Sequence, residues 1–114
     1  MAEYLLIESR DPFESNDVGY YYDLARALLE AGDKVTLFLV QNSVFAVRPL
    51  AQAPMLRALV GSGVKVIADE FALKERGITK VFAGAQIAPI DMVVATRLYG
   101  TRRLVCSKRP LQSH

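Results

Sequence analysis

Residues 23–41 read Asp-Leu-Ala-Arg-Ala-Leu-Leu-Glu-Ala-Gly-Asp-Lys-Val-Thr-Leu-Phe-Leu-Val-Gln, and this stretch decides the fold class. Its apolar residues recur at helical spacing, which predicts a helix that extends back to Val18 and ends near Ala31. Gly32 then stands where a left-handed helix stop is expected. Residues 34–41 are rich in branched and aromatic side chains, which predicts a strand buried on both faces. A helix followed at once by such a strand is typical of α/β proteins.

The rest of the chain continues this alternation of apolar runs and helical patterns. The expected strands are 3–8, 64–68 and 103–107, and the expected helices are 54–60, 70–76 and 90–98. Segment 42–54 is a loop or a broken helix with two prolines, and segment 81–88 is poorly defined. Strands that alternate with helices at this spacing pair in parallel through right-handed crossovers. The sequence therefore predicts one domain over residues 1–114, a three-layer Rossmann-like or flavodoxin-like α/β fold with a mostly parallel five-stranded sheet.

The composition favours a folded domain that associates with further copies of itself. Of the 114 residues, 52% are hydrophobic and 23% are charged, which argues against disorder and low-complexity behaviour. A domain of this size buries roughly two thirds of the surface of its unfolded chain. Because this chain holds more apolar residues than that geometry hides easily, we expect a homo-oligomer.

The scarcity of cysteine and histidine excludes several kinds of site. Cys106 is the single cysteine, which excludes a disulfide within the chain and a cysteine-rich metal site. The single histidine is His114, which argues against a histidine-built zinc centre or a catalytic triad. The chain lacks an apolar window of transmembrane length, and its N-terminus lacks the features of a signal peptide. We therefore expect a cytoplasmic protein that makes no membrane contact and holds no metal.

The net charge of +2 is distributed unevenly along the chain. Residues 1–96 carry nine bases against twelve acids, whereas the remainder carries five bases and no acid. Such an end is either a solvated strand end and tail or a contact for an acidic partner or nucleic acid. We do not favour nucleic acid, because this end lacks the series of stacking aromatic side chains typical of nucleic-acid contacts. The five bases are Arg97, Arg102, Arg103, Lys108 and Arg109.

The loop after the first expected strand argues against nucleotide binding. Residues 9–17 read Ser-Arg-Asp-Pro-Phe-Glu-Ser-Asn-Asp, without the glycines of a dinucleotide site or the lysine of a phosphate-binding loop. Asp11, Glu14 and Asp17 could form a paired-carboxylate or magnesium site, because hard cations favour clustered carboxylates. We prefer a solvated acidic loop in which Asp17 complements a helix N-terminus. The loop therefore implies no cofactor.

Three stretches of the chain form a recognisable pattern. They are residues 23–35, residues 36–44 (Thr-Leu-Phe-Leu-Val-Gln-Asn-Ser-Val), and Gly-Val-Lys-Val-Ile at 63–67 leading to Leu-Lys-Glu-Arg-Gly-Ile at 73–78. Their order and spacing resemble the DsrE/DsrF-like family over nearly the whole chain. The resemblance implies a small Rossmann-like α/β fold that assembles into trimers or hexamers. For the sulfur carriers of that family it also implies a relay through a cysteine persulfide and a sulfur-relay protein as partner.

The resemblance places an aspartate where those carriers have their active cysteine. In the carriers this cysteine follows the third strand, between a Gly-Val start and an Arg-Gly turn, and the matching position here is Asp69. A helix N-terminus stabilises an anion, which explains a thiolate in one protein and a carboxylate in another. A carboxylate cannot carry a persulfide. We favour Asp69 as a plain helix cap, with a ligand or proton-transfer role in a retained pocket as the alternative.

Cys106 is the only thiol that could replace the missing one. It lies in the last expected strand and not at a helix N-terminus, so it lacks the usual activator. The cations Arg102, Arg103 and Lys108 could lower its pKa because they stabilise a thiolate. A lone strand cysteine is more often buried packing, and Cys106 is therefore a weak catalytic candidate.

Ligands of parallel α/β sheets bind at the carboxyl ends of the strands, where the strand order reverses. That rule places Ser9, Asp11, Asn42 and Asp69 near one crevice. The preferred function is a DsrE-like oligomeric protein associated with sulfur trafficking. The alternatives are a non-catalytic module that binds a small ligand or partner in this crevice, and a structural subunit of a hetero-oligomer. A sulfurtransferase requires that Cys106 is exposed and reactive.

Two segments without charge, Val35–Val47 and Val81–Ile90, suggest where an oligomer would form. Only the strand part of the first is needed inside the sheet, so several apolar side chains are left in loops. Exposed together, they would form an apolar patch that another subunit covers in a trimer or hexamer. The rival is a monomer whose loops fold back over their own crevice. The side chains are those of Val44, Phe45, Val47, Val81, Phe82 and Ile87.

Overall fold

The computed structural model describes residues 3–9, 17–51, 53–92 and 103–107, of which residues 17–21 and 103–107 are described as backbone only. Within these residues the chain forms a parallel sheet of five strands, in the order β4-β3-β2-β1-β5. The predicted fold class is confirmed. The strands are β1 (Glu3–Glu8), β2 (Lys34–Leu39), β3 (Lys65–Asp69), β4 (Ala85–Ala88) and β5 (Arg103–Ser107).

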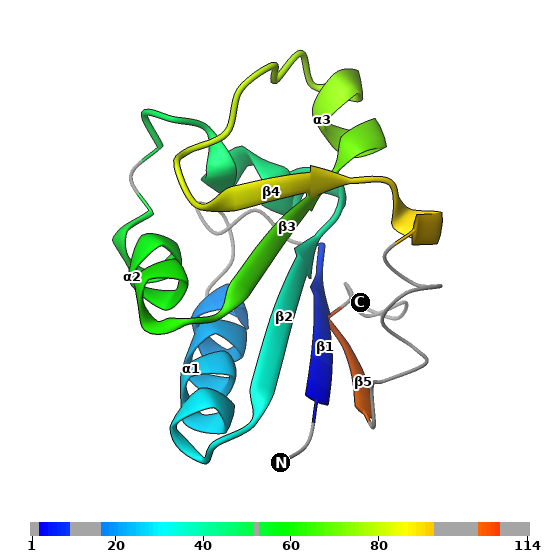
Figure 1. The fold of residues 1–114 in the computed structure, drawn as a ribbon. Coiled ribbons are helices and arrows are strands. Elements are labelled where there is room, and N and C mark those ends of the chain that lie inside the picture. The colour runs from blue at the N-terminus through cyan, green and yellow to red at the C-terminus, as the bar shows by residue number, and fades with distance from the viewer. Residues whose placement is uncertain (1–2, 10–16, 52, 93–102, 108–114) are drawn as a thin grey trace.

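The helices lie close to their expected positions (Figure 1). Residues 90–92 are helical as expected, and the rest of the predicted helix 90–98 lies outside the described residues. None of the helices in the described part of the chain is long and apolar enough to cross a membrane. The helices are α1 (Asp17–Glu30), the 3₁₀ helix η1 (Gln41–Val47), α2 (Pro54–Ser62) and α3 (Glu70–Glu75).

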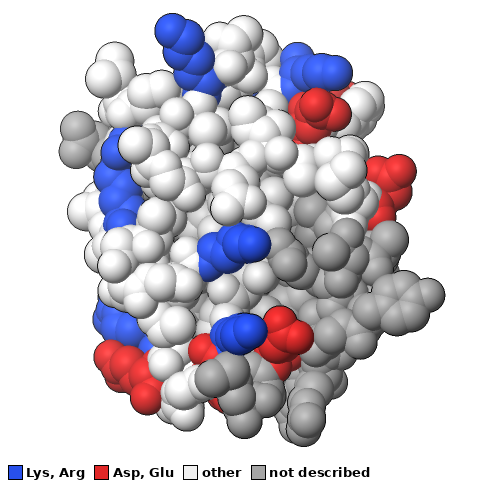
Figure 2. Space-filling view, in the orientation of Figure 1, with Lys and Arg blue, Asp and Glu red and all other residues white. Residues whose placement is uncertain are grey.

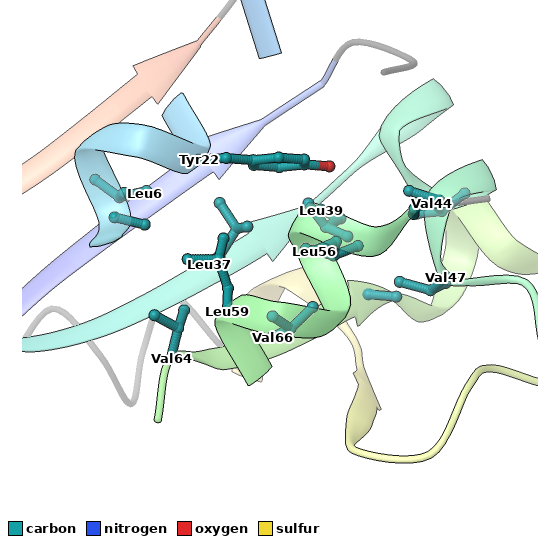
Figure 3. Close-up of a cluster of buried hydrophobic side chains, with 14 of the residues drawn as sticks. Leu6, Tyr22, Leu37, Leu39, Val44, Val47, Leu56, Leu59, Val64 and Val66 are labelled. Carbon is teal, nitrogen blue, oxygen red and sulfur yellow. The ribbon is translucent and has the colours of Figure 1, made fainter. Parts of the chain in front are cut away.

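The main core lies between one face of the sheet and helices α1 and α2 (Figure 3). Alternate strand residues such as Leu6, Leu37 and Val66 point to this face, where Leu56 and Leu59 of α2 meet them. All five of these side chains are at most 1% exposed. Burial of a leucine or valine side chain contributes about 1.5–3 kcal/mol, so this cluster is a large stabilising term.

The intervening strand residues form a second core on the opposite face of the sheet. Leu5, Phe38 and Ile67 are buried there, with Ile7 and Ala88 packed against them. Both faces of β1, β2 and β3 are therefore apolar. This explains why these strands appear in the sequence as continuous hydrophobic runs.

The segment after β2 differs from the sequence-based expectation of exposed apolar loops. Val44 and Val47 are fully buried within η1, and Phe82 is only 4% exposed. They are buried because η1 packs against α3 and β3, while the Phe82 backbone N–H donates to the carbonyl of Val47 over 2.8 Å. The prediction that Val44, Val47 and Phe82 are exposed in loops is therefore wrong. Of the six side chains expected to form an apolar patch, Ile87 is the most exposed, at 46%.

A glycine turn holds the start of β4 close to α2. Gly84 has φ +100°, a conformation that side-chain-bearing residues rarely adopt. A Cβ atom at this position would lie 2.6 Å from Cγ1 of Val60. The turn therefore needs glycine for its backbone conformation and also for the close packing of α2.

Candidate functional site

The carboxyl ends of strands β1, β2, β3 and β4 lie along one edge of the sheet. Glu8 pairs with Leu39, and Asp69, at the end of β3, pairs with Ala88. The strand order reverses between β1 and β5, because the chain adds β2, β3 and β4 on one side of β1 and β5 on the other. This edge is where the general rule for parallel sheets places a ligand.

Asp69 ends β3 and caps helix α3. Its side chain is buried, with 7% of the residue exposed, and its Oδ2 accepts a hydrogen bond from the backbone N–H of Ala72 over 3.2 Å. The predicted cap is confirmed. The other carboxylate oxygen, Oδ1, is buried and has no hydrogen-bond partner among the described residues. Only one of the two carboxylate oxygens therefore takes part in the cap.

Asn42 is connected to the same region by Arg76. The guanidinium group of Arg76 donates to Asn42 Oδ1 from Nε at 3.2 Å and from Nη2 at 2.9 Å. Its Nη1 donates to the carbonyl of Ala72, the residue whose N–H Asp69 caps. The predicted site residues Asn42 and Asp69 are therefore linked through one arginine that the sequence analysis did not single out.

Hydrogen bonds connect the end of β1 to the start of η1. Ser43 is fully buried, and its Oγ lies 2.7 Å from the carbonyl oxygens of both Glu8 and Val40, to either of which it can donate. The Val40 N–H also donates to the Glu8 carbonyl over 2.9 Å. Ser9 directly follows Glu8, the last residue of β1, and is half-buried. The ends of β1 and β2 are therefore held rigidly beside each other.

A second buried carboxylate, Glu8, escaped the sequence analysis. It is fully buried at the end of β1. By strand alternation it shares the face of Leu6, whereas Asp69 shares the face of Ile67. The two carboxylates therefore point to opposite faces of the sheet.

The remaining predicted site residues are less fully described. The backbone of Cys106 lies in β5, opposite Ile7 of β1, as the predicted last strand requires. Its side chain, Asp11, Glu14 and the side chain of Asp17 lie outside the described residues, as do the side chains of the basic C-terminal end. Among the residues that are described, no group of three acidic, cysteine or histidine side chains could hold a metal ion.

Two open pockets flank helix α3, and Asn42 and Asp69 line neither of them. The first, of about 370 Å³, lies between the outer side of α3 and Ile87 of β4. The second, of about 480 Å³, lies between the end of η1 and the segment after α3, and it includes Arg48, Arg76 and Lys80. The carboxyl edge of the sheet therefore carries a buried polar cluster, and two hollows lined by described residues lie beside it.

Comparison with known proteins agrees with this architecture. The model of the DsrE/DsrF-like family matches residues 3–101. The ychN protein from E. coli superposes with a TM-score of 0.84 at 19% identity, covering 94% of this chain and 100% of the other. A protein of unknown function from Methanobacterium thermoautotrophicum superposes with a TM-score of 0.82 at 14% identity, with the same coverage of both chains.

No curated protein sequence matches the chain closely enough to indicate a relationship. At these low identities the two solved structures support the fold alone. The family match is different in kind, because it spans most of the chain, from the first residue of β1 to the segment just before β5. The chain therefore belongs to the DsrE/DsrF-like family.

Proposed function

We propose that this protein is an oligomeric cytoplasmic member of its family that is associated with sulfur trafficking and does not carry sulfur at residue 69. Membership of the DsrE/DsrF-like family supports the association with sulfur relay. The observation that carries the second part is the capping carboxylate of Asp69 at the N-terminus of α3. A carboxylate offers no sulfur nucleophile, so any sulfur chemistry of this chain must use another group or another subunit.

The local physics supports a substitution that keeps the fold of the site. A helix N-terminus stabilises an anion, and Asp69 supplies one while also capping the helix. Asp69 therefore replaces a thiolate without loss of the local structure. The sole remaining thiol, Cys106, lies in β5 at the edge of the sheet, opposite Ile7 of β1.

Exposed apolar side chains near the ends of β3 and β4 support the oligomeric part of the proposal. Phe71 and Ile90 each lie two residues beyond the register pair of Asp69 and Ala88. An exposed apolar patch is typical of a surface that another subunit covers, and we infer that four exposed side chains at this edge form one. We call this surface the α3–β4 patch. It consists of Phe71 (66% exposed), Ile87 (46%), Ile90 (49%) and Met92 (59%).

The proposal is tested by incubating the protein with a cysteine desulfurase and cysteine labelled with radioactive sulfur. We expect no covalently retained label in the Cys106→Ser variant, because no thiol remains. Label retained there would contradict the proposal. Label that appears in the wild type and is lost in Cys106→Ser would make Cys106 a substitute carrier.

A gain-of-function variant tests whether the cysteine desulfurase can transfer sulfur to residue 69. Asp69→Cys in the Cys106→Ser background places a thiol at the N-terminus of α3, where its thiolate is stabilised. We expect this variant to take up label. If the folded variant takes up no label, the desulfurase cannot transfer sulfur even to a thiol at residue 69. That result would argue against an association with sulfur trafficking.

The second candidate function is a non-catalytic binding module that uses the same site. It is favoured by Oδ1 of Asp69, which is buried and has no hydrogen-bond partner among the described residues. Asp69→Asn keeps an oxygen that can cap α3 but removes the charge. Native mass spectrometry should then show a small molecule that co-purifies with the wild type and is lost from this variant, although the variant is only slightly less stable in urea.

A further inference from the structure

A basic pocket lies beside α3. Asp69 does not line it, but it includes Arg76, which also holds Asn42. It has a volume of about 480 Å³ and is formed where the end of η1 meets the segment that follows α3. Its lining combines Phe45 and Leu50 with the cations Arg48, Arg76 and Lys80 and the hydroxyl of Thr79. Its size lies within the range of small-molecule sites, about 300–1,000 Å³.

The charge of this pocket is one-sided. Arg48, Arg76 and Lys80 line it, and none of its described lining residues is acidic. Glu75 lies 3.6 Å from Arg76 Nη1, but its side chain is 53% exposed, so solvent weakens its effect. In the orientation of Figure 2 the upper left part of the surface shows basic side chains and no acidic one.

The two guanidinium groups are held in place around one aromatic ring. The Cζ atoms of Arg48 and Arg76 lie 5.1 and 5.9 Å from the centroid of the Phe45 ring. Arg48 Nε also donates to the Phe45 carbonyl over 2.8 Å, and Arg76 is fixed by Asn42. Cations held in advance lose less conformational entropy when they bind an anion.

From this arrangement we propose that the pocket binds a small molecule that carries a tetrahedral oxyanion ester, a phosphate or a sulfate, on an apolar group. The oxyanion is bound by Arg48, Arg76 and Lys80, with the Thr79 hydroxyl as a further donor. The apolar group lies against Leu50, which is 91% exposed, and Ile78. This site is independent of any sulfur chemistry at Asp69 or Cys106.

The test is an NMR titration of the ¹⁵N-labelled protein with phenyl phosphate, phenyl sulfate and, as the uncharged probe, phenol. We expect saturable shifts of the Gly77, Thr79 and Lys80 amides with at least one of the two esters, weakened by added salt. Tighter binding of phenyl phosphate assigns the site to phosphate esters, and tighter binding of phenyl sulfate assigns it to sulfate esters. Binding of phenol as tight as that of the esters would overturn the proposal.

Two variants and a matched control locate the site. Lys80→Gln and Arg48→Gln each remove one cation of the pocket and should weaken ester binding about threefold or more. Lys65→Gln removes a cation that is also exposed, at the start of β3 and the opposite end of the sheet, and should leave binding unchanged. Each variant is compared by its amide spectrum, so a folding defect is recognised. Equal weakening by all three variants, or the absence of saturable shifts with either ester, would refute the site.

Discussion

Arg76, at the end of α3, donates two hydrogen bonds to the side-chain oxygen of Asn42, which lies 34 residues earlier in η1. This contact joins the segments that follow β2 and β3 at the carboxyl edge of the sheet. Arg76 also donates a hydrogen bond to the carbonyl of Ala72. The same side chain therefore caps the end of α3 and holds η1 against it. The position of α3, and with it the orientation of Asp69, therefore depends on a contact between distant segments.

We expect a double-mutant cycle of Asn42→Ala and Arg76→Ala to give a favourable coupling of about 0.5–1.5 kcal/mol in the free energy of unfolding. The cycle is needed because Arg76 has other partners, whose loss appears in the single variant. Urea denaturation of the four proteins supplies the measurement. A coupling that does not differ from zero would mean that water replaces this contact without loss.

Asp69→Ala should lower the free energy of unfolding by about 0.5–2 kcal/mol, because the N–H of Ala72 loses its acceptor. Asp69→Asn should cost much less, since the amide oxygen can accept the same hydrogen bond. Both values come from urea denaturation. If the alanine variant is as stable as the wild type, the capping role is refuted.

Gly84→Ala should destabilise the protein more than Gly32→Ala does. Both glycines have positive φ, at +100° and +93°, but a Cβ at Gly32 would meet nothing within 4 Å. The control variant therefore measures the backbone strain, about 1 kcal/mol, and the excess in Gly84→Ala measures the collision with Val60, about 1–3 kcal/mol. Adding Val60→Ala should recover part of that excess; no recovery would place the cost in the backbone alone.

Ile87→Asp should reduce the mass of the particle in solution if the α3–β4 patch is an intersubunit contact. A buried unpaired carboxylate costs several kcal/mol at such a contact, enough to dissociate a small oligomer. Light scattering at micromolar concentration measures the mass, which we expect to be that of a trimer or hexamer for the wild type. Leu50→Asp is the matched control, since Leu50 is 91% exposed and lies outside the patch. A monomeric wild type would refute the oligomer.

Elements that depend on local signals could be predicted from the sequence. Strands β1 and β5 have the predicted bounds, Asp69 has the predicted capping role, and Gly32 has the positive φ of the predicted left-handed helix stop. Each of these rests on a continuous apolar run or on the backbone preference of one residue. By contrast β4 was missed, because its four residues, Ala-Gln-Ile-Ala, are too few for a pattern to emerge.

The parts of the site that were missed depend on contacts between distant segments. A cation at the end of a helix is favoured by the helix dipole alone, so nothing local in the sequence indicates that Arg76 reaches Asn42. The burial of Val44 and Val47 was missed for a similar reason. Their burial depends on the packing of η1 against α3 and β3, and a segment with no charge is equally compatible with an interface and with a core.

The pairing of β1 with β5 has a consequence for how the protein is made. Tyr4 lies opposite Arg103, so a strand from the beginning of the chain receives its second neighbour only when the last strand has left the ribosome. Until then β1 has one unpaired edge, and unpaired strand edges are prone to pair with other chains. During synthesis, the N-terminal half of this protein therefore exposes a strand edge that only its own C-terminal segment covers.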